Sequence, residues 1–335
     1  MILSKIFQSK KILVVGDSIL DWYVHGKVTR VSPEAPVPVV LKKEEKLFPG
    51  GSANVAQNVV SLGAEAHLLS ICGDDSNSDS LTRICKDRKI STSFFKDRTR
   101  PTTTKIRVIG NNHQITRIDD EQIHPIDEEL EKKIFEKFQE LVIGVDAVII
   151  QDYGKGVLTE TLTRKIIETS ISSGVLVIVD PKDKNLAKFS GCTLIKPNLS
   201  ELKLIGGISP DSELRTNEIV SICRKIIDDF GISMVLVTLS EDGMLLVSKK
   251  EKIIEPGIKI EVSDVSGAGD TVSATLALCL AGGLSLSDSV KISNAAGSIV
   301  CQFSGAVPIH SGQLFGYLEK THPLLQSKDG SPILV

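Results

Sequence analysis

The sequence lacks the patterns that define several common classes of protein. Its 335 residues contain no apolar run near the ~20 residues that a membrane-spanning helix needs. The formal net charge is −3, whereas a nucleic-acid-binding surface is usually clearly basic. The N-terminus carries lysines but no apolar signal-peptide core followed by a small-residue cleavage site. We therefore expect a cytoplasmic protein that binds neither nucleic acid nor a membrane.

Paired cysteines are also missing. A zinc site or a disulfide framework needs closer or patterned spacing, and no C-x-x-C occurs among the six cysteines. Most of them lie in apolar neighbourhoods, so we expect small buried hydrophobic residues. The six are Cys72, Cys85, Cys192, Cys223, Cys279 and Cys301.

Two familiar nucleotide-binding motifs are absent. The P-loop pattern G-x-x-x-x-G-K-[ST] occurs nowhere, and no G-x-G-x-x-G follows the first apolar run. The chain also has no internal repeat and no low-complexity linker. These absences exclude the P-loop and the dinucleotide-binding fingerprint. The length of the chain fits either one large α/β domain or two smaller domains.

Short β-branched runs alternate with amphipathic patterns along most of the chain. Continuous apolar runs of this length are typical of parallel strands buried on both faces. Strict alternation with helices predicts right-handed crossovers and a doubly wound, mostly parallel sheet covered on both sides. The predicted strands are 11–17, 66–73, 146–152, 175–181, 192–198 and 233–240, and helices are predicted at 127–142, 159–174 and 215–231.

Two regions, about 22–48 and 92–118, interrupt this alternation. The first contains "VSPEAPVPVV" (31–40), whose three prolines exclude a helix interior and favour a straight, extended segment. The second reads as a hairpin around "GNNHQ". Neither has a crossover helix nearby, so we expect the two regions to form a small sheet beside the α/β body.

Two stretches near the N-terminus could bind a polar ligand. In open α/β sheets ligands bind beyond the carboxyl ends of the strands, where "GDSILD" places Asp17 and Asp21. Their carboxylates can accept hydrogen bonds from sugar hydroxyls, although Asp17 can equally cap a helix. In "FPGGSANVAQNVVSLG", Gly50 and Gly51 allow a close backbone approach, and the Asn54 amide can both donate and accept. A Gly-Gly pair alone is usually only a turn.

The segment "EVSDVSGAGDTVSATLALCLAGG" (261–283) carries most chemical information. Gly267, Ala268 and Gly269 precede Asp270 and a helix rich in small residues. Free N–H groups and the macrodipole at a helix N-terminus suit a transferring phosphoryl group. Asp270 in the first turn could take a proton from an attacking hydroxyl, as a general base does. The alternative is an aspartate that only stabilises the start of the helix.

Two further segments follow predicted strands. In "IKPNLSEL", Asn198 and Glu201 share one face of an opening helical turn, where their oxygens suit Mg²⁺ held through water. A capping box between the same two residues is the alternative, and both can hold together. The stretch "VTLSEDG" (237–243) could line a nucleotide pocket or form a plain turn.

Together these motifs resemble the ribokinase-like (PfkB) carbohydrate kinases. "GGSANVA" and "DVSGAGD" match the two family signatures, and "GDSILD", "NLSE" and "VTLSEDG" occur in the expected order over nearly the whole chain. The resemblance implies an α/β body with a β-sheet lid, in which MgATP phosphorylates a sugar hydroxyl. It assigns Asp270 as general base and the amides of Gly267, Ala268 and Gly269 as the anion hole. It further implies nucleotide contacts at Asn198, Leu199, Ser200, Glu201, Thr238, Ser240 and Gly243, with Asn198 and Glu201 serving Mg²⁺, and sugar contacts at Asp17, Asp21, Gly50, Gly51 and Asn54.

Within that family, "RVSPEAPVPVV", "QDYGKGVL" and "VDPK" resemble the kinases of D-glycero-β-D-manno-heptose 7-phosphate, which form the 1,7-bisphosphate for lipopolysaccharide precursors. We expect a stand-alone kinase, because the 335 residues leave no room for a second, nucleotidyltransferase domain. We also expect a homodimer formed through the lid. Candidates for holding the 7-phosphate are Lys105, Arg107 and Arg117, although a charged exposed strand face explains each of them as well.

Three alternatives stay open at this point. The chain could be another sugar or nucleoside kinase of this fold, since substrate choice lies in the lid and in first-strand contacts. It could be a sugar-binding regulator that has lost catalysis, against which the intact Asp270 with its glycines argues. The proline-rich segment could serve only as a dimer contact.

Overall fold

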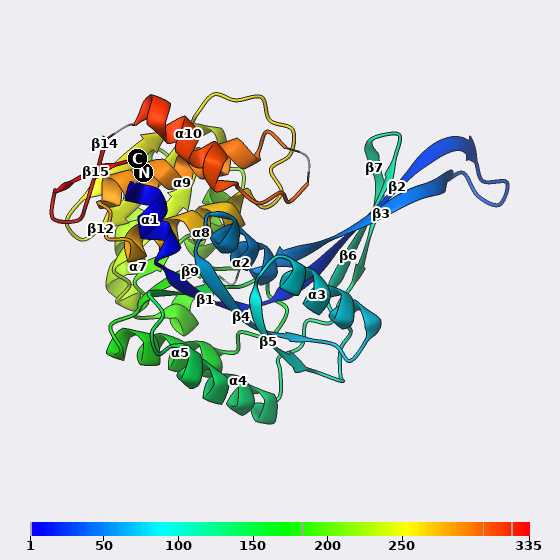
Figure 1. The fold of residues 1–335 in the computed structure, drawn as a ribbon, viewed down its shortest axis with the longest axis horizontal. Coiled ribbons are helices and arrows are strands. Elements are labelled where there is room, and N and C mark those ends of the chain that lie inside the picture. The colour runs from blue at the N-terminus through cyan, green and yellow to red at the C-terminus, as the bar shows by residue number, and fades with distance from the viewer. Residues whose placement is uncertain (1, 183, 304, 323) are drawn as a thin grey trace.

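A nine-stranded sheet forms the centre of the molecule in the computed structural model, which describes residues 2–182, 184–303, 305–322 and 324–335. Its strands are β1 (Lys11–Gly16), β4 (Glu65–Cys72), β5 (Ser91–Lys96), β8 (Ala147–Gln151), β9 (Leu176–Asp180), β10 (Leu194–Ile195), β11 (Met234–Thr238), β12 (Gly243–Ser248) and β13 (Lys252–Pro256). They lie in the order β13-β12-β11-β10-β9-β8-β1-β4-β5 (Figure 1).

The strands from β11 to β5 are parallel, and β12 and β13 add an antiparallel hairpin at one edge. The predicted doubly wound, mostly parallel sheet is therefore confirmed, as are the predicted strands. The strand predicted at 192–198 is shorter than expected. Only Leu194–Ile195 pairs on both sides, because Pro197 has no N–H to donate and the chain then turns into a helix.

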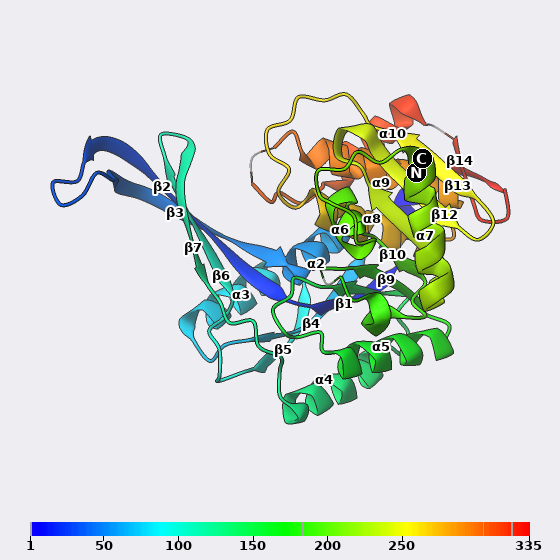
Figure 2. The same ribbon diagram turned by 180° about the vertical axis from the view of Figure 1, so that it is seen from behind.

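Helices cover both faces of this sheet (Figures 1 and 2). Two separate apolar clusters lie on the two sides, one packed under each helical layer. One layer contains α1 (Ile2–Gln8), α2 (Ser52–Ser61), α3 (Ser76–Asp87), α8 (Ala268–Ala281), α9 (Leu286–Val300) and α10 (Ser311–Thr321). The other contains α4 (Glu128–Leu141), α5 (Glu160–Ser172), α6 (Leu199–Ile205) and α7 (Thr216–Phe230), with the short 3₁₀ helices Leu186–Phe189 and Ser240–Asp242 in loops.

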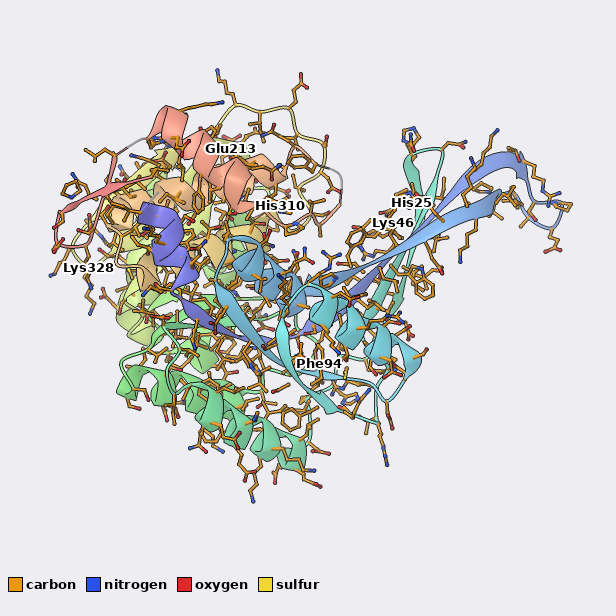
Figure 3. All side chains as sticks on the ribbon, in the orientation of Figure 1. His25, Lys46, Phe94, Glu213, His310 and Lys328 are labelled. Atoms are coloured by element: carbon orange, nitrogen blue, oxygen red, sulfur yellow. The ribbon has the colours of Figure 1, made fainter. Side chains whose placement is uncertain are left out.

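A second sheet projects from the body. It consists of β2 (Ser18–Val31), β3 (Pro38–Gly51), β6 (Thr104–Gly110) and β7 (His113–Asp120), in the order β3-β2-β6-β7. We call it the side sheet; Figures 1 and 2 show it extending away from the helices, and Figure 3 shows His25 and Lys46 on it. Asn111 and Asn112 both have positive φ, which is typical of a type I′ hairpin turn. A two-stranded sheet of β14 (Leu324–Gln326) and β15 (Pro332–Leu334) lies near the C-terminus.

Two expectations about the side sheet need correction. The range 92–118 starts too early, because most of its first residues belong to β5, the edge strand of the central sheet. The segment 31–40 is not a straight ribbon: residues 33–37 bend between β2 and β3 at the tip of the hairpin. Proline cannot donate to a strand ladder, so the prolines occur where the ladder ends, and this tip points away from the body (Figure 1).

Two simpler expectations concern burial. Within the described residues, no helix is both long enough and apolar enough to cross a membrane. The cysteines are free, and all except the half-buried Cys301 are buried, which confirms their interpretation as small hydrophobic residues.

Candidate active site

Asp270 lies in the first turn of α8 and is 4% exposed. Its two carboxylate oxygens receive hydrogen bonds from two sides. The Asn54 amide of α2 donates to Oδ2 over 2.7 Å, and the Tyr153 hydroxyl donates to Oδ1 over 2.8 Å. Gln151, the last residue of β8, donates its Nε2 to the same Oδ1 over 3.2 Å. The carboxylate is thus held in one orientation by side chains far apart in the sequence.

A buried ion pair lies directly behind this carboxylate. Lys196 Nζ is 3.0 Å from Asp180 Oδ2; Asp180 is the last residue of β9, and Lys196 directly follows β10. Gln151 Nε2 donates to the same Asp180 oxygen over 3.0 Å, so one amide links the two aspartates. Lys196 Nζ also lies beside Gly269, 3.6 Å from where a Cβ would stand. A fixed positive charge therefore adjoins the start of α8.

The N-terminus of α8 is shaped by Gly267, which has φ 79° in the left-handed region. A Cβ on it would stand 2.8 Å from Asn54 Nδ2, so any larger residue would displace the amide that holds Asp270. Among the described residues, the amides of Gly267 and Gly269 donate to no carbonyl, whereas Ala268 N–H bonds Val265 O over 3.2 Å. Free amides and the helix macrodipole are the features that the predicted anion site requires.

Burial raises the pKa of Asp270 to about 7, against the lowering effect of the hydrogen bonds from Asn54 and Tyr153. The charge of Asp180 raises this pKa further, and Lys196 lowers it. A carboxylate with a pKa near neutrality can accept and release a proton within the physiological range, which is what a general base requires. Asp270 therefore lies beside free backbone amides at the carboxyl edge of a parallel sheet, where the predicted base and anion site would be.

The Gly50–Gly51 pair brings the end of β3 against β2. A Cβ on Gly50 would stand 2.2 Å from Asp21 Oδ2, and Gly51 has φ 58° beside the Asp17 carbonyl. Asp21 Oδ1 in turn accepts from Arg107 Nη1 over 2.5 Å. The glycines thus serve close packing of the chain on itself, and their predicted contact with a sugar stays a prediction.

The Asp17 carboxylate is enclosed and 1% exposed. Its oxygens accept three backbone N–H groups, from Tyr153 over 2.8 Å, Lys155 over 3.1 Å and Val157 over 3.2 Å. Burial, and secondly the charge of Asp152, raise its pKa to about 6. Asp17 therefore neither caps a helix nor offers a free acceptor. This geometry favours a structural role for Asp17 over the predicted sugar contact.

The three predicted phosphate-binding cations differ in their surroundings. Arg107 is half-buried, stacks over the Tyr23 ring at 5.1 Å and pairs with Asp21. Lys105 is half-buried and its pKa is lowered, mainly by burial. Arg117 is 47% exposed and pairs with Asp119 on its own strand, as a surface residue would. Strand register places all three on one face of the side sheet, because Lys105 pairs with Asp119 and Arg107 with Arg117.

The predicted nucleotide segments lie next to each other. Asn198 forms an isolated bridge with Thr238, and Ser240 and Gly243 have φ of 54° and 94° in the turn that follows. Asn198 and Glu201 form a capping box, with reciprocal hydrogen bonds of 3.0 and 2.8 Å. The capping alternative is therefore real. At the start of α6, Ser200 is exposed, whereas Leu199 is partly buried and packs against an apolar cluster.

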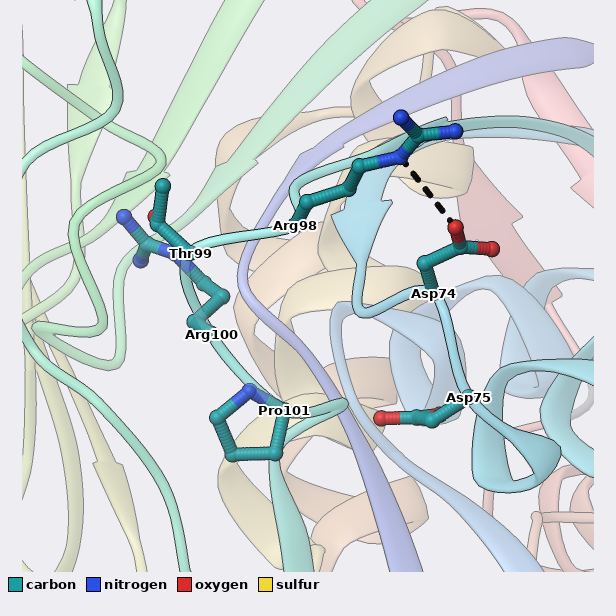
Figure 4. Close-up of a pocket in the computed structure, with 6 residues that line it drawn as sticks. All are labelled: Asp74, Asp75, Arg98, Thr99, Arg100 and Pro101. Atoms are coloured by element: carbon teal, nitrogen blue, oxygen red, sulfur yellow. Dashed lines mark hydrogen bonds and ion pairs between the residues drawn. The ribbon is translucent and has the colours of Figure 1, made fainter.

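The open hollow in Figure 4, of about 610 Å³, lies beside the loop at Arg98–Pro101. Its charged side chains are paired with the protein: Arg98 with Asp74 over 3.3 Å, and Asp75 with Thr102. The buried Arg100 donates to Asp97 over 2.6 Å. These pairs hold the loop, and the residues that line the hollow include neither Asp270 nor the side chains that bond it.

Sequence reasoning assigned no role to four residues of this site. Each of them ends a parallel strand or follows one within two residues, and polar residues at the carboxyl ends of such strands are the signal that could have found them. They are Gln151, Tyr153, Asp180 and Lys196, from "QDYGKGVL", "VDPK" and "KPNLSE".

Comparison with known proteins identifies the family of the chain. The model of the pfkB family carbohydrate kinases matches residues 9–311. The bifunctional protein HldE of Helicobacter pylori strain HPAG1 is 41% identical over 315 residues, 94% of this chain and 67% of that protein. The bifunctional protein HldE of Campylobacter fetus is 38% identical over 304 residues, 90% of this chain and 65% of that protein. The chain thus spans about two thirds of the length of these relatives.

Solved structures show the same fold. Phosphofructokinase-2 from Escherichia coli, in complex with fructose-6-phosphate, aligns with a TM-score of 0.76 at 20% identity over 92% of this chain and 99% of that chain. Arabidopsis thaliana ribokinase, in complex with ribose and ATP, aligns with a TM-score of 0.69 at 19% identity over 92% of this chain and 99% of that chain.

Fold and site together define an ATP-dependent carbohydrate kinase with a ribokinase-like fold. The chain belongs to the pfkB family of carbohydrate kinases.

Proposed function

We propose that this kinase transfers the γ-phosphoryl group of ATP to the anomeric hydroxyl of D-glycero-β-D-manno-heptose 7-phosphate, giving the 1,7-bisphosphate. The observation that carries the proposal is Asp270, buried and held by Asn54 and Tyr153 at the free amides of α8. The choice of sugar is supported by the family branch that the motifs resemble and by the similarity to the HldE proteins.

In the proposed reaction Asp270 accepts the proton of the sugar hydroxyl as its oxygen bonds to the γ-phosphorus. The bond between that phosphorus and the bridging oxygen breaks, and ADP leaves with the electron pair. Charge on the transferring oxygens is stabilised by the amides of Gly267 and Gly269 and by Lys196 beside them. Phosphoryl transfer depends mostly on such positioning and charge stabilisation, and this site supplies both.

The sugar phosphate is proposed to lie between the site and the side sheet, which would act as a lid. Asp21, Arg107 and Lys105 are on the same sheet face, and the Lys105 ammonium interacts electrostatically with Lys155 and Glu121 of the body. This face therefore offers several cations where the 7-phosphate would bind. Arg117, paired and half exposed, is the weaker candidate.

ATP is proposed to bind where the Asn198–Thr238 bridge joins the start of α6 to the end of β11. Its contacts would be Asn198, Thr238, Ser240 and Gly243. Within the described residues, no cluster of three acidic, histidine or cysteine side chains could hold a metal ion. Glu201 Oε2 is occupied by the capping box and Oε1 lies 3.4 Å from Lys182. Glu201 and Asn198 therefore fit Mg²⁺ only through its water shell, with the phosphates as direct ligands.

A homodimer through the side sheet is proposed as well. Strands β3 and β7 are its edges, and large apolar side chains are exposed on it: Val31, Val37, Leu41, Ile115 and Ile118. Exposed strand edges and apolar patches of this kind are usually covered by a partner, and a second copy presents the same surface. A tetrameric form of Escherichia coli phosphofructokinase-2 shows that one protein of this fold associates.

A substrate panel tests the proposed function. ADP release would be measured with heptose 7-phosphate, fructose 6-phosphate and ribose, with and without Mg²⁺, and phosphorus NMR would locate the new phosphate. We expect the highest kcat/KM with heptose 7-phosphate, phosphate at the anomeric carbon, and no turnover without Mg²⁺. Asp270→Asn under the same conditions shows that turnover comes from this site. Faster turnover of fructose 6-phosphate or ribose would overturn the heptose assignment and favour another sugar kinase.

A further inference from the structure

We propose that Tyr153 is a positioning residue for Asp270, and that a nest of backbone amides around Asp17 holds Tyr153 in place. The inference rests on the proposed role of Asp270 as general base. It gives a function to Tyr153, which the sequence left without a role. It also gives a function to Asp17, which the sequence placed at the sugar.

The contact itself is direct. Tyr153 donates its hydroxyl to Asp270 Oδ1 over 2.8 Å from the first turn after β8. Burial, followed by the charges of Asp270, Asp180 and Asp21, raises the pKa of Tyr153 well above its usual value. The phenol therefore stays protonated at working pH and can only donate to the carboxylate. A donor to the ionised form stabilises the base in the state that accepts a proton.

The loop that carries Tyr153 is fixed by one buried carboxylate. Asp17 accepts the backbone N–H groups of alternate residues, Tyr153, Lys155 and Val157. We call this set of three alternate amides a nest because they converge on one anion, and here the anion belongs to the protein itself. Three bonds to one carboxylate leave the loop little freedom around the Tyr153 Cα.

The glycines between these residues make the nest possible. Gly154 and Gly156 have φ of 67° and 90°, and a Cβ on Gly156 would stand 2.0 Å from the His124 carbonyl. The left-handed residues turn alternate amides toward the same side, where Asp17 lies. The sequence Tyr-Gly-Lys-Gly-Val thus has the pattern that this geometry requires.

The other charged and polar groups around Asp270 show which hydrogen bond depends on Tyr153. Asn54 donates from α2, Gln151 from β8, and the Asp180–Lys196 pair lies behind them. Asn54 holds Oδ2, so Oδ1 depends on Tyr153 and on the longer bond from Gln151. Without the phenol, Oδ1 loses its shorter hydrogen bond while Asp180 continues to repel the charge.

The nest has charges of its own. Asp17 faces the carboxylate of Asp152, which pairs with Lys188 over 2.8 Å. The ammonium of Lys155 pairs with Glu121 over 2.7 Å. Protonation of Asp17 at low pH would therefore weaken its three hydrogen bonds from backbone N–H groups at once. The loop that carries Tyr153 would then be released.

The experiment compares pH profiles of kcat/KM for the wild type, Tyr153→Phe and the control Tyr317→Phe. Tyr317 is a partly exposed tyrosine on α10. Loss of the donor should move the acid limb of Tyr153→Phe about one pH unit higher, because hydrogen bonds to charged groups are worth more than neutral ones. At pH 7 we expect a several-fold lower kcat/KM, approaching the wild-type value by pH 9. Tyr317→Phe should follow the wild type throughout.

A second variant tests the connection through the loop. Asp17→Asn removes the charge that the three amides share, and we expect the same displacement of the acid limb. The double variant Asp17→Asn with Tyr153→Phe should show no further displacement, because both changes act on one contact.

An unmoved acid limb in Tyr153→Phe would overturn the proposal, even with a uniformly lower kcat, since that pattern indicates packing alone. Additive effects in the double variant would overturn the role of Asp17. Turnover retained in Asp270→Asn would overturn both the proposed base and the role of Tyr153. If Asp270→Asn loses turnover but the acid limb of the pH profile is unmoved in Tyr153→Phe, only the role of Tyr153 is overturned.

Discussion

Asn54 Nδ2 lies 2.7 Å from Asp270 Oδ2, although 216 residues separate the two in the chain. The contact joins the start of α2 to the start of α8, and with it the two glycine-containing signatures of the sequence. Each signature alone predicts a turn followed by a helix. Brought together, they place an amide donor on a buried carboxylate beside free backbone amides, and the proposed catalytic role of Asp270 rests on that arrangement.

Replacing the base should nearly abolish turnover. In Asp270→Asn the site keeps its shape but cannot accept the hydroxyl proton, so we expect kcat to fall roughly 10²–10⁴-fold. ATP affinity, measured by calorimetry, should change little. The control is Asp211→Asn, an exposed aspartate in the loop before α7. Unchanged turnover in Asp270→Asn would exclude this residue as the base.

The pH dependence of activity and that of stability should have opposite signs. Activity should rise with pH through about 7, because Asp270 must be ionised to act. The folded-state pKa of about 7 exceeds the unfolded value near ~3.9, so the folded protein binds the extra proton between these values. Asp270 therefore favours folding less as pH rises from about 4 to 7.

Thermal unfolding of wild type and Asp270→Asn at pH 5 and pH 8 checks that sign. We expect the difference in Tm, variant minus wild type, to be more positive at pH 8 than at pH 5, because the variant has no buried carboxyl group at position 270 to ionise. Asp211→Asn should show the same difference at both pH values. A relative Tm that falls with pH would contradict the raised pKa.

Gly267→Ala should damage the anion site. The residue has φ 79°, where a side chain costs roughly 1–2 kcal/mol, and its Cβ would press on the Asn54 amide. We expect kcat to drop at least about 10-fold, since orientation of the base is disturbed as well. Gly312→Ala on α10, whose added Cβ meets no atom within 4 Å, serves as the control and should be neutral in both kcat and denaturant midpoint. Full activity of Gly267→Ala would show that the left-handed turn is dispensable.

Arg107→Ala should weaken binding of the sugar phosphate. The change removes a cation from the proposed lid and leaves the Asp21 carboxylate, 10% exposed, without its ion-pair partner. We expect KM for the sugar phosphate to rise about 10-fold or more, with KM for ATP unchanged. Arg107→Lys should recover little, because an ammonium lacks the guanidinium fork. Arg164→Ala, an exposed position on α5, is the control; a rise in KM confined to ATP would place Arg107 elsewhere in the mechanism.

The proposed dimer can be disrupted at the side sheet. Leu41→Lys with Ile118→Lys places charges on two exposed apolar positions, and sedimentation velocity should show a shift from dimer to monomer. Ile143→Lys alters an apolar residue of the body that is 82% exposed, and the dimer should persist. Wild-type protein that sediments as a monomer at micromolar concentration would refute the dimer.

Much of the fold could be predicted from the sequence because its signals are local. Apolar runs such as residues 11–17 and 146–152 are strands since their side chains are buried on both faces, and the Asn111–Asn112 turn identifies its hairpin. The prolines of 31–40 predicted a straight, extended segment, whereas residues 33–37 bend between β2 and β3. Proline excludes a helix locally, but whether it lies within a strand or ends one depends on the partner strand.

The sequence by itself determined which residues are candidates for the chemistry: Asp270 after its glycines, Asn54, and the Asn198–Glu201 pair, all recognisable from neighbours along the chain. Only the tertiary structure decided how these residues are arranged. It turned Asn54 toward Asp270, enclosed Asp17 in the amides of a distant loop, and brought Tyr153 onto the base. Hydrogen bonds across 100 or more residues depend on how the sheet stacks its strand ends, and burial at that edge sets the pKa that local sequence does not contain.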